Sequence, residues 1–268
     1  MHRYKNPLKK NLLILSGGIE AIEGIKVAKK MGLRTIVCDG NKNAPGKSYA
    51  DEFLIGNIYD PIEIKNVISK YRKKKSIDGV ITIASDAVRS VSTVAKQLNL
   101  SGNSMKTSIL STDKLKMKKV FQKYSLPIPN YVGISNRNEL HKQIEHFSDA
   151  VLKPVDNRGS RGVIRINKNS DVDKAFDYSM NFSSSKKLIL EKWLHGYQLS
   201  SESLVISSKT HLCGTADRNY SNLKNTFPYV IEDGGETPSR FYPKIKNELQ
   251  KIMDVVAKAF EIKNGVLK

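Results

Sequence analysis

The sequence predicts an α/β half, roughly residues 1–106, followed by an α+β half over residues 107–268. In the first half, short apolar runs alternate with segments whose apolar residues recur at helical spacing. This pattern is typical of a parallel sheet that is covered by helices on both faces. In the second half, short strands separated by turns dominate, which indicates a largely antiparallel sheet with few helices.

Four strands and three helices are predicted in the first half. Gly17 and Gly18 follow the first apolar run, and Gly32 is suited to end the helix that comes next. A dinucleotide-binding domain is a rival interpretation, but the turn SGGIEAIEG lacks the G-x-G-x-x-G spacing of that class. The predicted strands cover residues 11–16, 33–39, 52–57 and 78–85, and the helices run from Ile22 to Gly32, over 61–72 and from Ala87 to Leu98.

The second half opens with a helix that Thr112 or Asp113 can cap and that Pro127 and Pro129 stop. Met117, Val120, Phe121 and Tyr124 give this helix an apolar stripe. Further helices are predicted near residues 137–147, 171–180 and 243–260, with strands at 149–155, 162–166, 187–193, 197–207, 210–217 and 227–233.

Composition and charge exclude several classes of protein. No apolar run approaches the roughly 20 residues that span a bilayer, and the start MHRYKNPLKK is interpreted as a basic lead-in to the first strand, so we expect a cytoplasmic protein without membrane contact. Cys38 and Cys213 lie far apart, which argues against a disulfide framework or a zinc site. The net charge of +19 invites a nucleic-acid hypothesis, but the lysines are scattered and not grouped with aromatics. The charge still favours phosphorylated or carboxylate ligands.

The segment LKPVDNRGSRGV, residues 152–163, carries the first candidate site. Lys153 ends a predicted strand, and Gly159 and Gly162 bracket Ser160 and Arg161. Glycines permit positive φ, so such a loop can turn its N–H groups toward one point, and the cationic side chains of Arg158 and Arg161 favour an anion there. A plain hairpin loop with a solvated lysine is the alternative that the segment alone leaves open.

Two further features follow in the chain. Glu191 comes directly after the apolar run LIL, as an exposed strand-end acid or as an acceptor for a base amino group. Gln198, Ser200 and Glu202 alternate along one strand and therefore share one face, which either meets solvent or lines a cleft. The order of these features is more specific than any one of them.

That order resembles the ATP-grasp superfamily, as represented by carbamoyl-phosphate synthase-like proteins, biotin carboxylases and D-alanine–D-alanine ligase-like enzymes. The segments that carry the resemblance are STDKLKMK (111–118), P-x-P (127–129), LKPVDNRGSRGV (152–163) and EKWL-x-G (191–196). The resemblance implies a Rossmann-like parallel-sheet domain over residues 1–106, the pre-ATP-grasp domain of the family. It also implies an ATP-grasp domain over 107–268, with a first subdomain at 107–190 and a second at 191–268.

The resemblance implies a role for each candidate residue. Lys114 would reach the ATP phosphates, Lys153 the α-phosphate and adenine side, and Arg218, the candidate catalytic residue, the transferred phosphate. Glu191 would accept the adenine amino group, with main-chain groups of Lys192 and Leu194 beside it and Trp193 packed alongside. Gln198, or else Glu202, would bind the ribose. The flap over the β- and γ-phosphates would consist of Gly159, Ser160, Arg161 and Gly162.

The implied reaction is ATP-dependent activation of a carboxylate as an acyl phosphate, followed by attack of an amine or similar nucleophile. Its partners would be small-molecule carboxylate and amine substrates, and a homodimer is left open. Residues 227–239 resemble the stretch that borders the acceptor site, without naming an acceptor.

Magnesium is the implied metal, but the E-x-N segment that supplies its ligands in the family is absent after Phe260. We therefore expect the ligands beyond Lys268 and a domain that lacks its C-terminal end. The alternative is a catalytically silent nucleotide-binding module or fragment.

Overall fold

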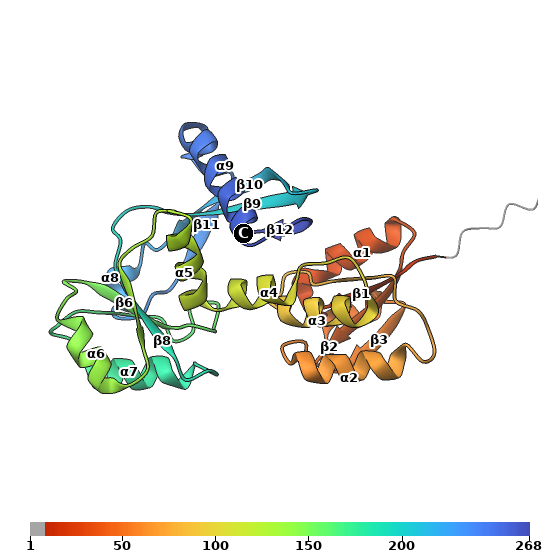
Figure 1. Cartoon of the computed structure of the whole chain (residues 1–268), viewed down its shortest axis with the longest axis horizontal. Helices are drawn as coiled ribbons and strands as arrows, with labels where there is room; N and C mark the ends of the chain where they lie inside the picture. Colours follow the sequence, from red (N-terminus) through yellow and green to blue (C-terminus); the bar gives the residue numbers. More distant parts are fainter. Residues whose placement is uncertain (1–8) are drawn as a thin grey trace, which may run out of the picture. The chain divides into compact units, whose positions relative to one another are not determined.

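The computed structural model describes residues 9–268, so the first eight residues of the basic lead-in lie outside it. The chain forms two compact units, of which the first ends at Ile109 and the second begins at Leu110 (Figure 1). Helix α4 (Met105–Thr112) contains this boundary. Within residues 9–268, no helix combines the length and the apolar character needed to cross a membrane.

The first unit is built around a four-stranded parallel sheet with the strand order β3-β2-β1-β4. This confirms the predicted parallel α/β fold. Its elements are β1 (Asn11–Leu15), the 3-10 helix η1 (Ile19–Ala21), α1 (Ile22–Lys30), β2 (Arg34–Asp39), the 3-10 helix η2 (Pro45–Tyr49), β3 (Glu52–Ile55), α2 (Pro61–Tyr71), β4 (Gly79–Ile81) and α3 (Val88–Leu98).

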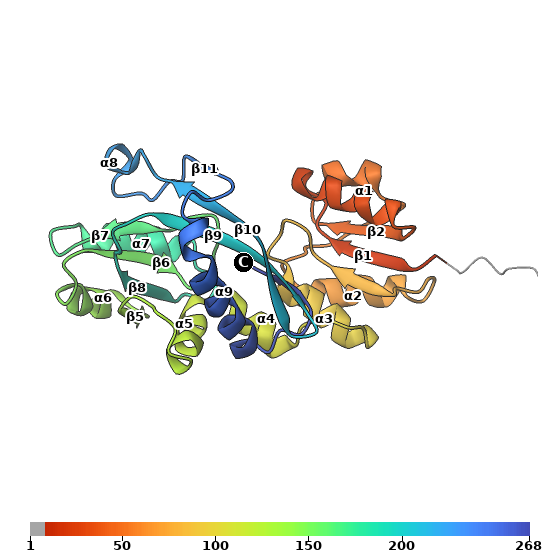
Figure 2. The ribbon, with the colours of Figure 1, turned by 90° about the horizontal axis from the view of Figure 1, so that it is seen from above.

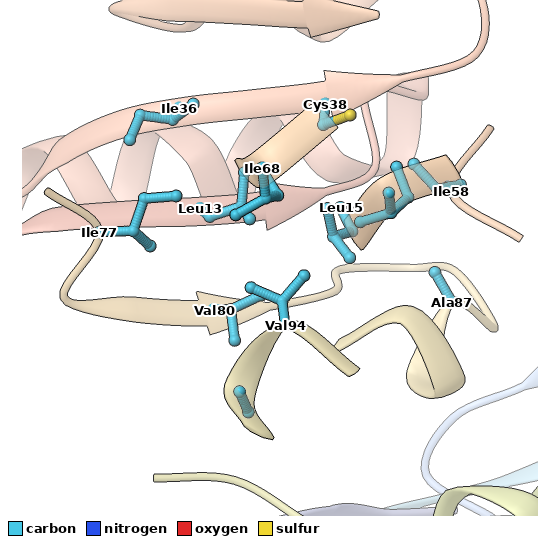
Figure 3. Close-up of a cluster of buried hydrophobic side chains, with 12 residues drawn as sticks. Leu13, Leu15, Ile36, Cys38, Ile58, Ile68, Ile77, Val80, Ala87 and Val94 are labelled. Atoms are coloured by element: carbon cyan, nitrogen blue, oxygen red, sulfur yellow. The ribbon is translucent and has the colours of Figure 1, made fainter. Parts of the chain in front are cut away.

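Both faces of this sheet are covered because successive strand residues point to opposite sides. Leu13 and Leu15 pack with side chains from α2 and α3, whereas Ile14 packs with α1 on the other face. Figure 2 shows α1 on one side of the sheet and α2 and α3 on the other. The larger of the two clusters appears in Figure 3, where Ile68 of α2 and Val94 of α3 lie against the strands. Continuous apolar strands are thus explained by burial on two faces.

The strand predicted at 78–85 is shorter than expected and ends at Ile81. The Thr82 hydroxyl donates a hydrogen bond to the Leu15 carbonyl at 2.8 Å, and Ala84 adopts a positive φ of 50°. A side-chain hydroxyl therefore takes over the pairing with β1, and the left-handed residue turns the chain away from the sheet.

The role of Asp60 as the N-terminal cap of α2 can be tested by substitution. The Asp60 carboxylate accepts hydrogen bonds from the N–H groups of Ile62 and Glu63, and Pro61 follows at the first helical position. We expect Asp60→Ala to destabilise α2 by about 1 kcal/mol, so its amides should exchange with solvent roughly fivefold faster. Asp60→Asn keeps an acceptor and serves as the control, and equal exchange in both variants would contradict the capping role.

The second unit contains two four-stranded sheets, with the strand orders β5-β8-β6-β7 and β11-β10-β9-β12. All pairings in both sheets are antiparallel, as the sequence predicts. Its elements are α5 (Lys114–Lys123), β5 (Tyr131–Ile134), α6 (Arg137–Ile144), β6 (Ala150–Pro154), β7 (Ile164–Ile166), α7 (Val172–Asn181), β8 (Leu188–Lys192), β9 (Gln198–Ile206), β10 (Lys209–Asn219), α8 (Leu223–Thr226), β11 (Gly234–Glu236), α9 (Tyr242–Ala259) and β12 (Gly265–Leu267).

Each sheet buries one face against helices. Leu152 and Leu190 of the first sheet pack with α6 and α7 in one cluster. Val205 of β9 packs with the end of α9, and the rings of Phe121 and Phe260 join α5 to this cluster with centroids 5.7 Å apart. The opposite faces of the two sheets are therefore available for polar side chains.

The segment predicted as a strand at residues 227–233 does not form one. Instead the segment lies along β7. The main-chain N–H of Arg165 donates to the Pro228 carbonyl at 2.8 Å, and Ile164 forms a single β-bridge with Tyr229. The strand after β10 is β11, which begins at Gly234. Pro228 has no N–H to donate, which is the physical reason why the apolar run does not continue as a paired strand.

Candidate functional site

The start of α5 places the first candidate cation. Asp113 caps the helix by accepting a hydrogen bond from the Lys116 N–H at 3.0 Å, as the sequence predicts. The N–H of Lys114 donates to the Val155 carbonyl at 2.8 Å, and its ammonium group donates to the Asn157 carbonyl. These contacts hold Lys114 against the loop that follows β6.

That loop is the glycine-rich segment, and it has a left-handed backbone at three positions. Gly159, Ser160 and Gly162 have φ values of +60°, +54° and +74°. The Gly162 carbonyl accepts a hydrogen bond from the buried hydroxyl of Ser179 at 2.8 Å. A Cβ at Gly162 would lie 2.8 Å from atoms of both Phe182 and Pro154. The loop therefore requires glycine at its end, where the chain packs tightly against α7.

The base of the loop is tied to the turn that follows α7. The Asn157 amide donates to the Phe182 carbonyl at 2.6 Å, and its own oxygen accepts from the Arg158 N–H at 2.8 Å. Asp156 accepts hydrogen bonds from Ser183 and Ser185. The tip from Gly159 to Arg161 is thus carried on a fixed base.

A cavity of about 330 Å³ lies beneath this loop. It brings together side chains from α5, β6, the loop, the end of β8 and β9, which are separated by more than 80 residues in the sequence. Among the predicted site residues, those that line it are Lys114, Lys153, Gly159, Ser160, Arg161, Trp193 and Gln198.

Trp193 forms one wall of the cavity in a fixed orientation. Its main-chain N–H donates to the Asp149 carbonyl at 3.0 Å, and the Arg165 guanidinium stacks over its ring at 4.6 Å from the centroid. Arg165 is in turn held by three hydrogen bonds to the Asp149 carboxylate. Asp149 raises the pKa of Arg165 further, chiefly through these hydrogen bonds, so the stacked cation stays charged.

Glu191 lies next to the cavity and does not line it. It is only 4% exposed, and its Oε1 lies 2.9 Å from the Lys153 ammonium and its Oε2 3.2 Å from that of Lys118. The contact to Lys153 is an ion pair by distance, because Oε1 satisfies no hydrogen-bond geometry within residues 9–268. Burial lowers the pKa of Lys118, and Glu191 opposes that effect.

The remaining predicted residues lie outside the cavity lining. Lys192 donates its N–H to the Asn130 carbonyl at 2.8 Å, and the side chain of Leu194 is exposed. Arg218 is opposite Gln198 in the sheet register but forms an ion pair with Glu232. Glu202 shares the strand face of Gln198 and pairs with Lys268 at 3.0 Å. These four residues thus do not line the cavity, although Arg218 interacts with the Tyr220 hydroxyl, which does.

Several residues of the site were not singled out from the sequence. Asn157, Tyr220 and Val230 line the cavity, and Lys118 pairs with Glu191. Burial raises the pKa of the Tyr220 hydroxyl, which keeps it a neutral hydrogen-bonding group. Asn157 lies within the glycine-loop segment, and Lys118 lies four residues after Lys114 and so shares its helix face, but neither position alone indicates a role.

A larger hollow of about 690 Å³ lies between the start of β10 and the end of α9. None of the predicted site residues lines it, and five of its lining side chains are charged, namely Lys209, Asp254, Lys258, Glu261 and Lys263. We therefore place the site under the glycine loop, where cations from separate elements converge, and not in the larger hollow.

The described residues do not fit a magnesium site. Within residues 9–268, no group of three or more histidine, cysteine, aspartate or glutamate side chains is arranged to hold a metal ion. Three acids on and beside the second sheet are paired with cations: Glu202 with Lys268, Glu232 with Arg218 and Asp217 with Arg240.

A glycine loop over a cavity, with lysines entering from a helix and from a strand, is an arrangement that suits a phosphorylated ligand. The profile of the ATP-grasp N-terminal domain matches residues 25–102, and that of the ATP-grasp domain matches residues 111–267. The second match alone covers more than half of the chain. This chain belongs to the ATP-grasp superfamily, as the sequence motifs indicated.

Known relatives are distant and longer. Formate-dependent phosphoribosylglycinamide formyltransferase from Methanococcus maripaludis is 23% identical over 69% of this chain and 48% of its own length. The enzyme of the same name from Prochlorococcus marinus is 24% identical over 75% of this chain and 51% of its own. The chain therefore spans about half the length of the curated relatives that it matches.

Solved structures agree on the fold. The L-amino acid ligase from Bacillus licheniformis superposes with a TM-score of 0.78 at 20% identity, over 96% of this chain and 62% of the other. Phosphoribosylglycinamide synthetase from Anaerococcus prevotii gives 0.70 at 23% identity, over 96% and 63%. At these identities the likeness establishes the fold alone.

Proposed function

We propose that this chain binds ATP under the glycine loop and is part of a ligase that activates a carboxylate as an acyl phosphate. The observation that carries the proposal is the convergence of Lys114, Lys153 and Arg161 on one cavity beside Trp193. The names of the relatives support the substrate class, since one is formate-dependent and another is an amino acid ligase. The site of action would be the cytoplasm.

In the proposed reaction, a carboxylate oxygen attacks the γ-phosphorus of ATP, and the bond to the β-phosphate oxygen breaks, which releases ADP. An amine then attacks the acyl carbon, inorganic phosphate leaves, and the nitrogen loses a proton to solvent. The side chains of this chain would act by placing the triphosphate and by neutralising charge that develops on its oxygens. Lys114 and Arg161 would face the outer phosphates, and Lys153 the α-phosphate.

The adenine would lie beside Trp193, where β8 ends. The N–H groups of Lys192 and Trp193 already donate to carbonyls of neighbouring segments. Leu194 is the first residue beyond those pairings, so we assign base recognition by the main chain to its vicinity. Gln198 would contact the ribose because it lines the cavity, whereas Glu202 is exposed and engaged with Lys268.

Calorimetric titration with ATP in magnesium buffer tests the assignment. We expect Lys153→Met to weaken ATP binding at least about tenfold, because a charge-assisted contact to phosphate is lost. Lys174→Met is the matched control, since Lys174 is an exposed helix lysine that pairs only with the neighbouring acid Asp171 in the pairs described. Equal affinities in the two variants would remove Lys153 from the site.

Turnover distinguishes the proposed ligase from a module that only binds nucleotide. Release of ADP and phosphate that depends on a carboxylate and an amine, measured over a panel of both, would exclude it. ATP binding without such turnover would favour it.

A further inference from the structure

Glu191 is paired with one more cation than its charge requires. Its side chain is 6% exposed, and the two lysines that pair with it are 15% and 21% exposed. Lys153 comes from β6 and also lines the cavity, whereas Lys118 comes from α5 and lies outside that lining. The cluster therefore contains two positive charges and one negative charge, nearly all out of solvent.

Such a surplus is not explained by the stability of the fold. Removing a charge from water costs several kcal/mol, and one lysine suffices to neutralise one carboxylate. The depressed pKa of Lys118, which burial causes, shows that the second ammonium group is held at a cost. A second lysine would be needed if Lys153 left Glu191 to bind another group.

We propose that Lys118 is a positioning residue, which keeps Glu191 charge-balanced when Lys153 leaves it for a nucleotide phosphate. This inference rests on the function proposed above. In the ligand-free state Lys153 pairs with Glu191 at 2.9 Å. When the α-phosphate takes Lys153, the pair of Lys118 and Glu191 remains behind as a neutral unit, with one carboxylate oxygen available to the base amino group.

Without Lys118 the same exchange would leave a buried carboxylate without a cation. Leaving one member of a buried ion pair unpaired is strongly unfavourable, and this cost would reduce the free energy of ATP binding. We therefore expect Lys118→Met to raise the Kd for ATP at least about tenfold.

Calorimetry on the full chain, with ATP as the probe, tests this expectation. Lys118→Met is compared with Lys116→Met, because Lys116 lies on the same helix, is 52% exposed and pairs with its own cap Asp113. We expect the control to bind like the wild type. If both variants bind like the wild type, Lys118 has no part in the exchange.

A Glu191→Gln background distinguishes a positioning role of Lys118 from a merely structural one. In Glu191→Gln chains no carboxylate needs balancing, so adding Lys118→Met should change the Kd less than about threefold. A loss as large as that in the wild-type background would overturn the proposal, because Lys118 would then act through packing. Failure of the wild type itself to bind ATP would instead refute the proposed function.

Discussion

Replacing Gly162 with alanine should lower the free energy of unfolding of the second unit by about 3 kcal/mol. The residue has a φ of +74°, and a Cβ there would lie 2.8 Å from Phe182 and Pro154 atoms. The left-handed backbone costs a non-glycine residue about 1 kcal/mol or more, and the overlap adds about 1–3 kcal/mol. Urea unfolding followed by the fluorescence of Trp193, the single tryptophan of the chain, reports on this unit.

Gly159→Ala is the matched control in the same loop. Its φ is +60°, but the nearest atom to a Cβ would be the flexible guanidinium of Arg161 at 3.7 Å. We then expect only the cost of the left-handed backbone, about 1 kcal/mol, in the free energy of unfolding. If the two variants are equally stable, the packing of Gly162 against the turn after α7 is not what fixes the loop.

Glu191→Ala should destabilise the second unit by about 3 kcal/mol. The substitution leaves two lysine ammonium groups facing each other across a nearly buried site, and removing one partner of a buried ion pair typically costs about 3–5 kcal/mol. We expect the lower end of that range because both lysines retain some access to water. The measurement is the same urea titration.

The triple variant Glu191→Leu, Lys118→Met, Lys153→Met provides the opposite test. Replacing a complete buried charge cluster with apolar side chains is often neutral or stabilising. We therefore expect the triple variant to unfold within about 1 kcal/mol of the wild type, although it should not bind ATP. A triple variant as unstable as Glu191→Ala would show that shape, and not charge, sets the cost.

The fold could be predicted largely from apolar periodicity. Strands buried on two faces, such as β1, give unbroken apolar runs, and their alternation with helices predicts a parallel sheet. Helix α4 was missed because its sequence, MKTSILST, has no apolar stripe. Residues 227–233 read as a strand, but Pro228 prevents regular pairing there.

The site could be predicted in part, because its loop and its first two lysines lie in distinctive sequence segments. Lys114 follows a helix cap and Lys153 ends a strand before the glycine loop. Lys118 is one of five lysines on α5, and sequence spacing cannot show which of them lies against a buried acid. That distinction depends on the tertiary contact between α5 and β8. Arg218 was placed by its motif, while its pairing with Glu232 arises from a loop that the sequence does not specify.

Residues 227–233, which lie along β7, also protect an edge of their sheet from pairing with a strand of another chain. An edge strand with open N–H and carbonyl groups is a template for aggregation. Here the chain covers that edge itself, through the hydrogen bond from Arg165 to Pro228 and the bridge between Ile164 and Tyr229. Because Pro228 carries no N–H, the covering segment cannot pass a regular ladder on to a further strand. The edge of the sheet beside the glycine loop is thus closed against strand addition.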